Sequence, residues 1–166
     1  KRADGSASPI TAAYAIHITS SMPAGFLGTK GGPIMASSDR LDIVITGKGG
    51  HASEPFRTFD PVPVTCEIVQ AIQAMVTRRF DIFDPTVVTV TRLVAGTAYN
   101  VIPESARIQG TIRAISAKTR SSVHELIQRV ADGVAGAGHG QPVQLERGVG
   151  GRLERADGER IAAPGQ

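Results

Sequence analysis

The sequence is poor in aromatic residues, in cysteine and in long hydrophobic runs. Aromatic residues make up 4% of the 166 residues, and tryptophan is absent. This argues against a protein that stacks the bases of single-stranded nucleic acid on aromatic side chains. Cys66 is the only cysteine, so an internal disulfide is excluded, which fits a reducing, cytoplasmic location. No hydrophobic run approaches the roughly 18 residues of a membrane-spanning helix, so we expect no membrane partner.

The charge of the chain is modest and spread along it. The formal net charge is +3, and lysine and arginine are scattered rather than gathered in one stripe. Such a distribution lacks the basic patch of a protein that binds nucleic acid. Hydrophobic residues make up 41% of the chain and charged residues 20%, an ordinary balance for a globular protein. We therefore expect a folded domain whose core is built from valine, isoleucine, leucine and alanine.

Composition divides the chain into three expected regions. Residues 1–38 are predicted to be an N-terminal flank, in which 12–18 has the apolar character of a short strand and 20–38 is rich in glycine, proline and serine. Residues 39–147 carry the hydrophobic periods of a compact domain. Residues 148–166 hold no apolar stripe long enough to bury and are expected to be a disordered tail. Because no signal-like segment opens the chain, we expect it to be a piece of a longer product.

The hydrophobic periods of the central region predict four strands and two helices. Helical spacing predicts helices that begin after Asp60 and Ser116, and Asp60 precedes a proline suited to a first turn. The order βαββαβ is typical of the ferredoxin-like fold, an α+β sandwich with a four-stranded antiparallel sheet and two helices on one face. Alternating apolar residues place strands at 41–46, 105–115 and 143–146, and a high density of β-branched residues places another at 86–94.

Two polar motifs follow the first and second predicted strands. Gly47–Ser53 contains His51 among glycines, and Gly96–Pro103 contains Asn100. In the ferredoxin-like order these strands are parallel and separated by one strand, so they leave the same edge of the sheet roughly 10 Å apart. We therefore expect His51 and Asn100 to converge. Arg113 lies near the end of the third strand, and periodicity leaves open whether it reaches the same edge.

Less specific interpretations exist for each of these residues. Neither motif contains a paired acid and base or a full set of metal ligands. His51 can be interpreted as an exposed loop histidine, Asn100 as a turn residue whose side chain caps its own backbone, and Arg113 as an exposed strand arginine. Among the other polar residues, His124 is expected to be solvated, and Cys66 to pack as a small hydrophobe.

The second predicted strand, 86–94, is an edge of the expected sheet. It is rich in valine and leucine, contains no proline, and carries Arg92 as its one charged residue. A long apolar edge of this kind invites pairing with the edge of another chain. We therefore expect a homodimer that forms through strand 86–94.

Four segments together resemble the satellite domain of the M20 metallopeptidase and amidohydrolase family. They are GKGGHASEP at 47–55, DPV at 60–62, VVTVTRLVAGTAYNVIP at 87–103 and GTIRA at 110–114. The resemblance is to the aminoacylase-like branch, which includes hippurate hydrolases and indole-acetyl-amino-acid hydrolases. It implies a ferredoxin-like lid and dimerisation domain. The whole enzyme would hydrolyse N-acyl amino acids or related amides with a divalent metal, zinc or manganese.

The resemblance also implies roles for single residues. His51 would be a catalytic histidine that reaches the partner subunit's active site and hydrogen-bonds the substrate or the oxyanion. Asn100 would contact the carboxylate end of the substrate, and Arg113 would pair with that carboxylate. Ala15–His17 resembles the end of the family's first catalytic stretch, so His17 would belong to an incomplete metal site. The other ligands and the general base have no counterpart here, so we expect the isolated chain to bind no metal and to be inactive.

Two other functions fit the predicted fold. A ferredoxin-like regulatory module would bind a small molecule, such as an amino acid, between subunits and would have no use for His17. An RNA-binding domain would need aromatic residues on its central strands, where this chain has valine, isoleucine, threonine and arginine. We therefore rank the amidohydrolase domain first, the regulatory module second and the RNA-binding domain last.

Overall fold

The computed structural model describes residues 12–138 and 144–147. The chain divides into two compact units, Lys1–Gly31 and Gly32–Gln166. Within the first unit, the described residues contain no helix and no strand. The expectation of a short strand at 12–18 is therefore wrong. A strand needs a neighbour for its backbone hydrogen bonds, and the described part of this unit offers none.

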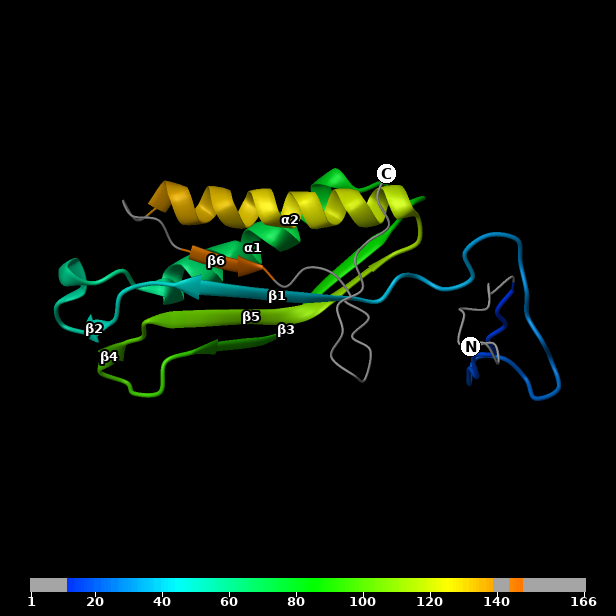
Figure 1. Ribbon diagram of the computed structural model, residues 1–166, viewed down its shortest axis with the longest axis horizontal. Helices are drawn as coiled ribbons and strands as arrows, with labels where there is room; N and C mark the ends of the chain where they lie inside the picture. Colours follow the sequence, from blue (N-terminus) through cyan, green and yellow to red (C-terminus); the bar gives the residue numbers. More distant parts are fainter. Residues whose placement is uncertain (1–11, 139–143, 148–166) are drawn as a thin grey trace, which may run out of the picture. The chain divides into compact units, whose positions relative to one another are not determined.

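The second unit contains every helix and strand that the structure describes. The strands β3, β5, β1 and β6 form one sheet in that order, with antiparallel neighbours, while β2 and β4 form a separate two-stranded sheet (Figure 1). The predicted α+β class is confirmed. In chain order the elements are β1 (Asp39–Thr46), β2 (Gly50–His51), the 3-10 helix η1 (Pro55–Arg57), α1 (Pro61–Arg79), β3 (Thr86–Ala95), β4 (Val101–Ile102), β5 (Ser105–Ala114), α2 (Ala117–Gly138) and β6 (Gln144–Arg147).

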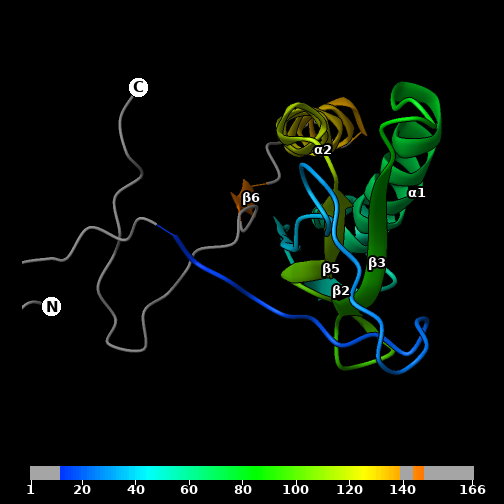
Figure 2. The ribbon, with the colours of Figure 1, turned by 90° about the vertical axis from the view of Figure 1, so that its right-hand side faces the viewer.

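Helices α1 and α2 pack against each other and cover one face of the main sheet (Figure 2). Alternation along β1 and β5 turns every second side chain toward the helices, and these side chains form the core. Burying one large aliphatic side chain contributes about 1.5–3 kcal/mol relative to leaving it exposed. The residues of this core that are at most 5% exposed include Leu41, Ile43, Ile45, Val64, Ile68, Ile72, Ile108, Ile112, Val123 and Ile127.

Both helices begin where the sequence predicts. The backbone N–H of Val62 donates to Oδ1 of Asp60 over 2.9 Å, which caps α1. The backbone N–H of Thr119 donates to Oγ of Ser116 over 3.0 Å, which caps α2. The hydroxyls of Ser116 and Thr119 in turn donate to Asp84. The Ser116 hydrogen bond is the main reason that the pKa of Asp84 lies below its usual value.

Strand β3 is an edge of the main sheet and contains a β-bulge. The register between β3 and β5 shifts between Val90 and Arg92. Because of the extra residue, Val88 before the bulge and Leu93 after it both stand opposite isoleucines of β5 that face the helices. Val87 and Val94 then lie on the opposite face, where they are 51% and 42% exposed.

Two side-chain predictions are wrong. Cys66 is exposed instead of packed, because two residues on a helix turn it about 200° away from the buried Val64. His124 is not solvated: its side chain is 20% exposed and lies beside the buried Asp39. The predicted tail at 148–166 lies outside the described residues.

Candidate functional site

The turn after β1 brings two backbone segments into close contact. The N–H of Gly47 donates to the Glu104 carbonyl over 2.8 Å, and Lys48 and Phe59 exchange two backbone hydrogen bonds of 2.9 Å. A Cβ at Gly49 would lie 2.7 Å from the carbonyl oxygen of Ile102, and a Cβ at Gly47 would overlap the carbonyl oxygen of Phe59. Glycine is therefore required here so that the backbones can approach each other.

The two polar motifs meet in the small sheet of β2 and β4. Gly50 pairs with Ile102 and His51 pairs with Val101, while the N–H of Ala52 donates to the carbonyl of Asn100 over 3.1 Å. The small sheet lies beyond the ends of β1 and β3 (Figure 1). The sequence-based expectation that His51 and Asn100 converge is correct as a statement about position.

The imidazole ring of His51 is exposed and is held from one side by Ser53. The backbone N–H of Ser53 donates to Nδ1 over 3.2 Å, and the Ser53 Oγ lies 2.7 Å from the same nitrogen. A turn in which the N–H of Glu54 donates to the His51 carbonyl over 2.9 Å folds Ser53 back over the ring. Ser53 was not among the residues singled out from the sequence, although its position two residues after His51 is the signal for such a contact.

Asn100 takes part in the small sheet through its backbone alone. Its side chain is exposed and forms no hydrogen bond with any residue that the structure describes. The interpretation of Asn100 as a residue that caps its own turn therefore has no hydrogen bond to support it. The amide group is available to a ligand.

Arg113 lies at the other end of the sheet. It stands opposite Val87 on β3, and its Nη1 donates to the Ser37 carbonyl over 3.4 Å. Ser105, at the start of the same strand, stands opposite Thr46 at the end of β1. Eight strand residues span about 27 Å. Within one chain the structure does not bring Arg113 to His51 and Asn100, which answers the question that periodicity leaves open.

His17 lies in the first unit, and it is exposed. Among the described residues, no group of three or more His, Cys, Asp and Glu side chains could hold a metal ion. A divalent metal bound for hydrolysis needs about three protein ligands. The described residues therefore do not fit the metal site that the family resemblance implies.

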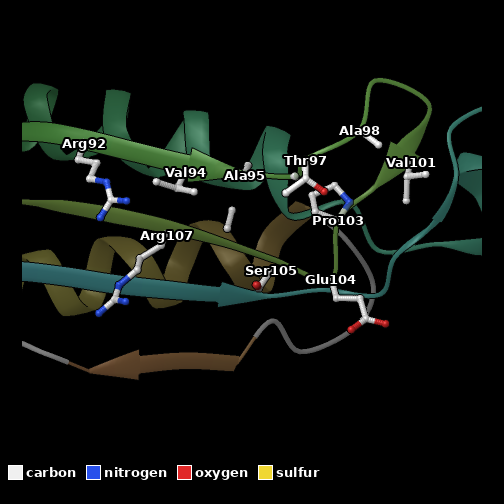
Figure 3. A pocket seen from close by; sticks show the side chains of 12 residues that line it. Arg92, Val94, Ala95, Thr97, Ala98, Val101, Pro103, Glu104, Ser105 and Arg107 are labelled. Carbon is white, nitrogen blue, oxygen red and sulfur yellow. The ribbon is translucent and has the colours of Figure 1, made fainter.

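A groove of about 650 Å³ is lined by residues of the C-terminal half of β3, of the segment 96–104 and of the start of β5 (Figure 3). Arg92 and Arg107 line one end, and Thr97 and Val101 line the other. Arg107 is held by two hydrogen bonds, 2.7 and 2.8 Å long, to the carboxylate of Asp42. The hydrogen bond from Arg107 is the main cause that holds the pKa of Asp42 below its usual value.

The start of β1 holds a buried charge that sequence reasoning missed. Asp39 is 3% exposed, and it accepts hydrogen bonds from Nε of Arg120 and from Oγ of Ser37, each over 2.9 Å. The Arg120 guanidinium holds the pKa of the Asp39 carboxyl well below its usual range. Nε2 of His124 lies 3.6 Å from the same carboxylate. Alternation along β1 marks position 39 as inward-facing, which is the signal that the side chain needs a partner.

Comparison with known proteins identifies the domain. Residues 37–139 match the family named M20_dimer, the peptidase dimerisation domain. The chain belongs to the M20 family. The resemblance seen in the four sequence segments is confirmed, and the M20 dimerisation domain covers both the small sheet and Arg113.

Relatives of this M20 domain are longer proteins. N-acetylcysteine deacetylase of Bacillus subtilis strain 168 is 40% identical over 137 residues, which are 82% of this chain and 36% of that protein. Thermostable carboxypeptidase 2 of Saccharolobus solfataricus is 40% identical over 123 residues, 74% of this chain and 31% of that protein. The chain thus spans about a third of the length of these relatives.

A solved structure has the same fold. The YXEP protein of Bacillus subtilis, a dinuclear metal binding peptidase from the M20 family, is 37% identical, with a TM-score of 0.53 over 72% of this chain and 27% of that one.

Neither of the α-helices that the structure describes is long and apolar enough to cross a membrane.

Proposed function

We propose that this chain is the ferredoxin-like lid and dimerisation domain of a metal-dependent amidohydrolase that acts on N-acyl amino acids or related amides. Family membership and the similarity to a deacetylase and a carboxypeptidase support the reaction class. The observation that carries the proposal is the small sheet of β2 and β4, which sets His51 beside the Asn100 loop at one end of the domain.

Two copies of the chain would complete one substrate-binding site. A small amide cannot reach from His51 to Arg113 within one chain, because about 27 Å of strand separates the two ends of the sheet. If two β3 edges pair in antiparallel fashion, the Ala95 end of one copy lies beside the Thr86 end of the other. Since Arg113 stands opposite Val87, the dimer brings His51 and Asn100 toward Arg113 of the partner subunit.

Each of the three side chains has chemistry suited to an N-acyl amino acid. The imidazole of His51 would donate a hydrogen bond to the oxygen that gains charge during amide hydrolysis. The Asn100 amide and the planar guanidinium of Arg113 would bind the substrate carboxylate. The described residues do not fit a divalent metal site, so the rest of the enzyme would hold the metal, zinc or manganese.

The catalytic role of His51 can be tested in a chimera. Residues 37–139 would replace the matching segment of B. subtilis N-acetylcysteine deacetylase, and turnover of N-acetylcysteine would be measured. We expect His51→Ala to lower kcat by about 100-fold or more, the loss seen when one oxyanion donor is removed. The control is Cys66→Ser, which changes an exposed residue of α1. An active His51→Ala chimera would reject the proposed role.

The dimer can be tested on the chain itself by light scattering after gel filtration. Val94→Lys places a charge on strand β3 opposite Val87 of the partner subunit, and we expect the dimer dissociation constant to rise by at least about ten-fold, because the pairing would set that charge against an apolar side chain. Phe56→Lys changes an exposed apolar residue of η1 and should leave the dimer intact. A monomeric native chain would contradict the proposal.

The isolated chain should not hydrolyse amides. The purified chain with added zinc or manganese is therefore expected to show no turnover of N-acyl amino acids. Measurable turnover would show that the chain is a complete enzyme. Tight binding of a free amino acid without turnover would instead favour the small-molecule regulatory module.

A further inference from the structure

The hydrogen bonds around His51 determine which ring nitrogen carries the proton. A backbone N–H can only donate, so Nδ1 of His51 accepts the Ser53 amide hydrogen and carries no proton of its own. The Ser53 hydroxyl, 2.7 Å from the same nitrogen, then also donates to it. In a neutral imidazole the remaining proton sits on Nε2.

We propose that Ser53 is a positioning residue that fixes His51 as the Nε2–H tautomer. This inference rests on the proposed function in one respect only: it takes His51 to be the group that contacts the substrate. Two bonds from one neighbouring residue hold the ring on its Nδ1 side, while Nε2 forms no hydrogen bond with any described residue. His51 therefore presents a ready N–H donor to its ligand.

The tautomer selects the chemical class of the ligand atom. An Nε2–H group can donate to a carboxylate oxygen or to an oxyanion. It has no free lone pair on Nε2, so this form of His51 cannot coordinate a metal or accept a proton there. The geometry thus assigns His51 to oxygen recognition and not to metal binding or to general-base catalysis.

The backbone of the turn makes this arrangement specific to position 53. The N–H of Ala52 is occupied by the Asn100 carbonyl, and the N–H of Glu54 is occupied by the His51 carbonyl. Only the N–H of Ser53, between them, points to the ring. The contact therefore depends on the β2–β4 pairing, which sets the path of the turn.

The tautomer can be measured in the chain itself, without substrate. The chain contains four histidines, so two-bond ¹H–¹⁵N correlation spectra of ¹⁵N-labelled protein resolve each ring, and His51→Gln assigns the signal. We expect His51 to populate Nε2–H more strongly than the exposed His17, which serves as an internal reference. A His51 ratio equal to that of His17, or an Nδ1–H majority, would overturn the proposal.

Variants separate the hydroxyl from a general structural effect. Ser53→Ala should lower the ratio of Nε2–H to Nδ1–H by about five-fold, the change that one net hydrogen bond makes. Ser53→Thr keeps the hydroxyl and should restore the ratio, and Ser121→Ala, an exposed serine of α2, should leave it unchanged. An unchanged ratio in Ser53→Ala would show that the Ser53 hydroxyl does not fix the tautomer of His51. If these results hold but the His51→Ala chimera stays active, the proposed function fails and the tautomer assignment stands.

Discussion

Asp39 at one end of the main sheet and His51 and Asn100 near the other end are held in opposite ways. Where β1 begins, Asp39 is buried, and its carboxylate is bonded to Arg120 and Ser37. Where β1 ends, His51 and Asn100 are exposed, and the contacts that place them are mostly backbone hydrogen bonds. The carboxylate of Asp39 is satisfied within the chain, whereas His51 and Asn100 retain hydrogen-bonding capacity for another molecule.

This difference indicates where stability and recognition reside. A buried, bonded carboxylate loses a great deal when a partner is removed, and it has nothing left to offer a ligand. An exposed side chain on a rigid backbone costs little to replace but is correctly placed to bind. Substitutions at the two ends should therefore differ in size and in kind.

The largest expected effect on stability is at the buried end. Asp39→Asn removes the charge that pairs with Arg120, and we expect the free energy of unfolding to fall by about 3 kcal/mol. Urea denaturation followed by circular dichroism measures this change. Glu125→Gln, at an exposed position of α2, is the control and should stay within about 0.5 kcal/mol. Equal changes in the free energy of unfolding in the two variants would show that the buried Asp39 carboxylate does not stabilise the fold.

The next-largest expected effect on stability is in the backbone near His51 and Asn100, which we call the recognition end of the domain. A Cβ at Gly49 would press on the Ile102 carbonyl, so Gly49→Ala should lower the free energy of unfolding by about 1–3 kcal/mol. Gly133→Ala is the matched control, because no atom lies within 4 Å of its Cβ position and alanine favours a helix. We expect Gly133→Ala to be neutral or stabilising in the same denaturation experiment. A tolerated Gly49→Ala would mean that the two-stranded sheet does not need its close backbone approach.

A further prediction concerns acid. The folded state holds the pKa values of Asp39 and Asp42 below their unfolded values. Stability from these groups is therefore complete above the unfolded pKa of about 4 and is lost as the pH falls further toward the folded values. Melting temperatures measured between pH 7 and pH 3 should decline at the acid end, and the decline should be shallower in Asp39→Asn. A parallel decline in that variant would exclude Asp39 as a source of the acid sensitivity.

The smallest expected effect on stability is at Asn100. Its side chain has no hydrogen bond within the described residues, so Asn100→Ala should change the free energy of unfolding by less than about 0.5 kcal/mol. In the chimera the same variant should raise KM, because it removes a contact to the substrate carboxylate. A large loss of stability with an unchanged KM would assign Asn100 to the fold instead of to the ligand.

Much of the fold could be predicted because its signals are local. Asp60 and Ser116 mark the two helix starts, alternation marks β1 and β5, and β-branched residues mark β3. The strand expected at 12–18 failed because an apolar run does not reveal whether a partner strand exists. The position of Cys66 failed for a different reason, since it lies at the margin of an apolar stripe, where the helical period is least decisive.

The candidate site was predictable in position but not in detail. Strand order alone brings His51 toward Asn100, whereas the end of the sheet to which Arg113 belongs depends on the register of β5 against β1. A period of two reports the face of a strand and not its register. The contact of Ser53 with His51 depends on one turn, and no hydrophobic pattern encodes it.

The small sheet of β2 and β4 has a consequence for the order of folding. It joins positions about fifty residues apart through only two residue pairs, and it starts from the point where Thr46 stands opposite Ser105. Closing so long a loop for so few contacts is favourable only after β1 and β5 have paired. We therefore expect the recognition end to form last and to open first, so that the amide of Ala52 exchanges with solvent deuterium faster than the amides between β1 and β5.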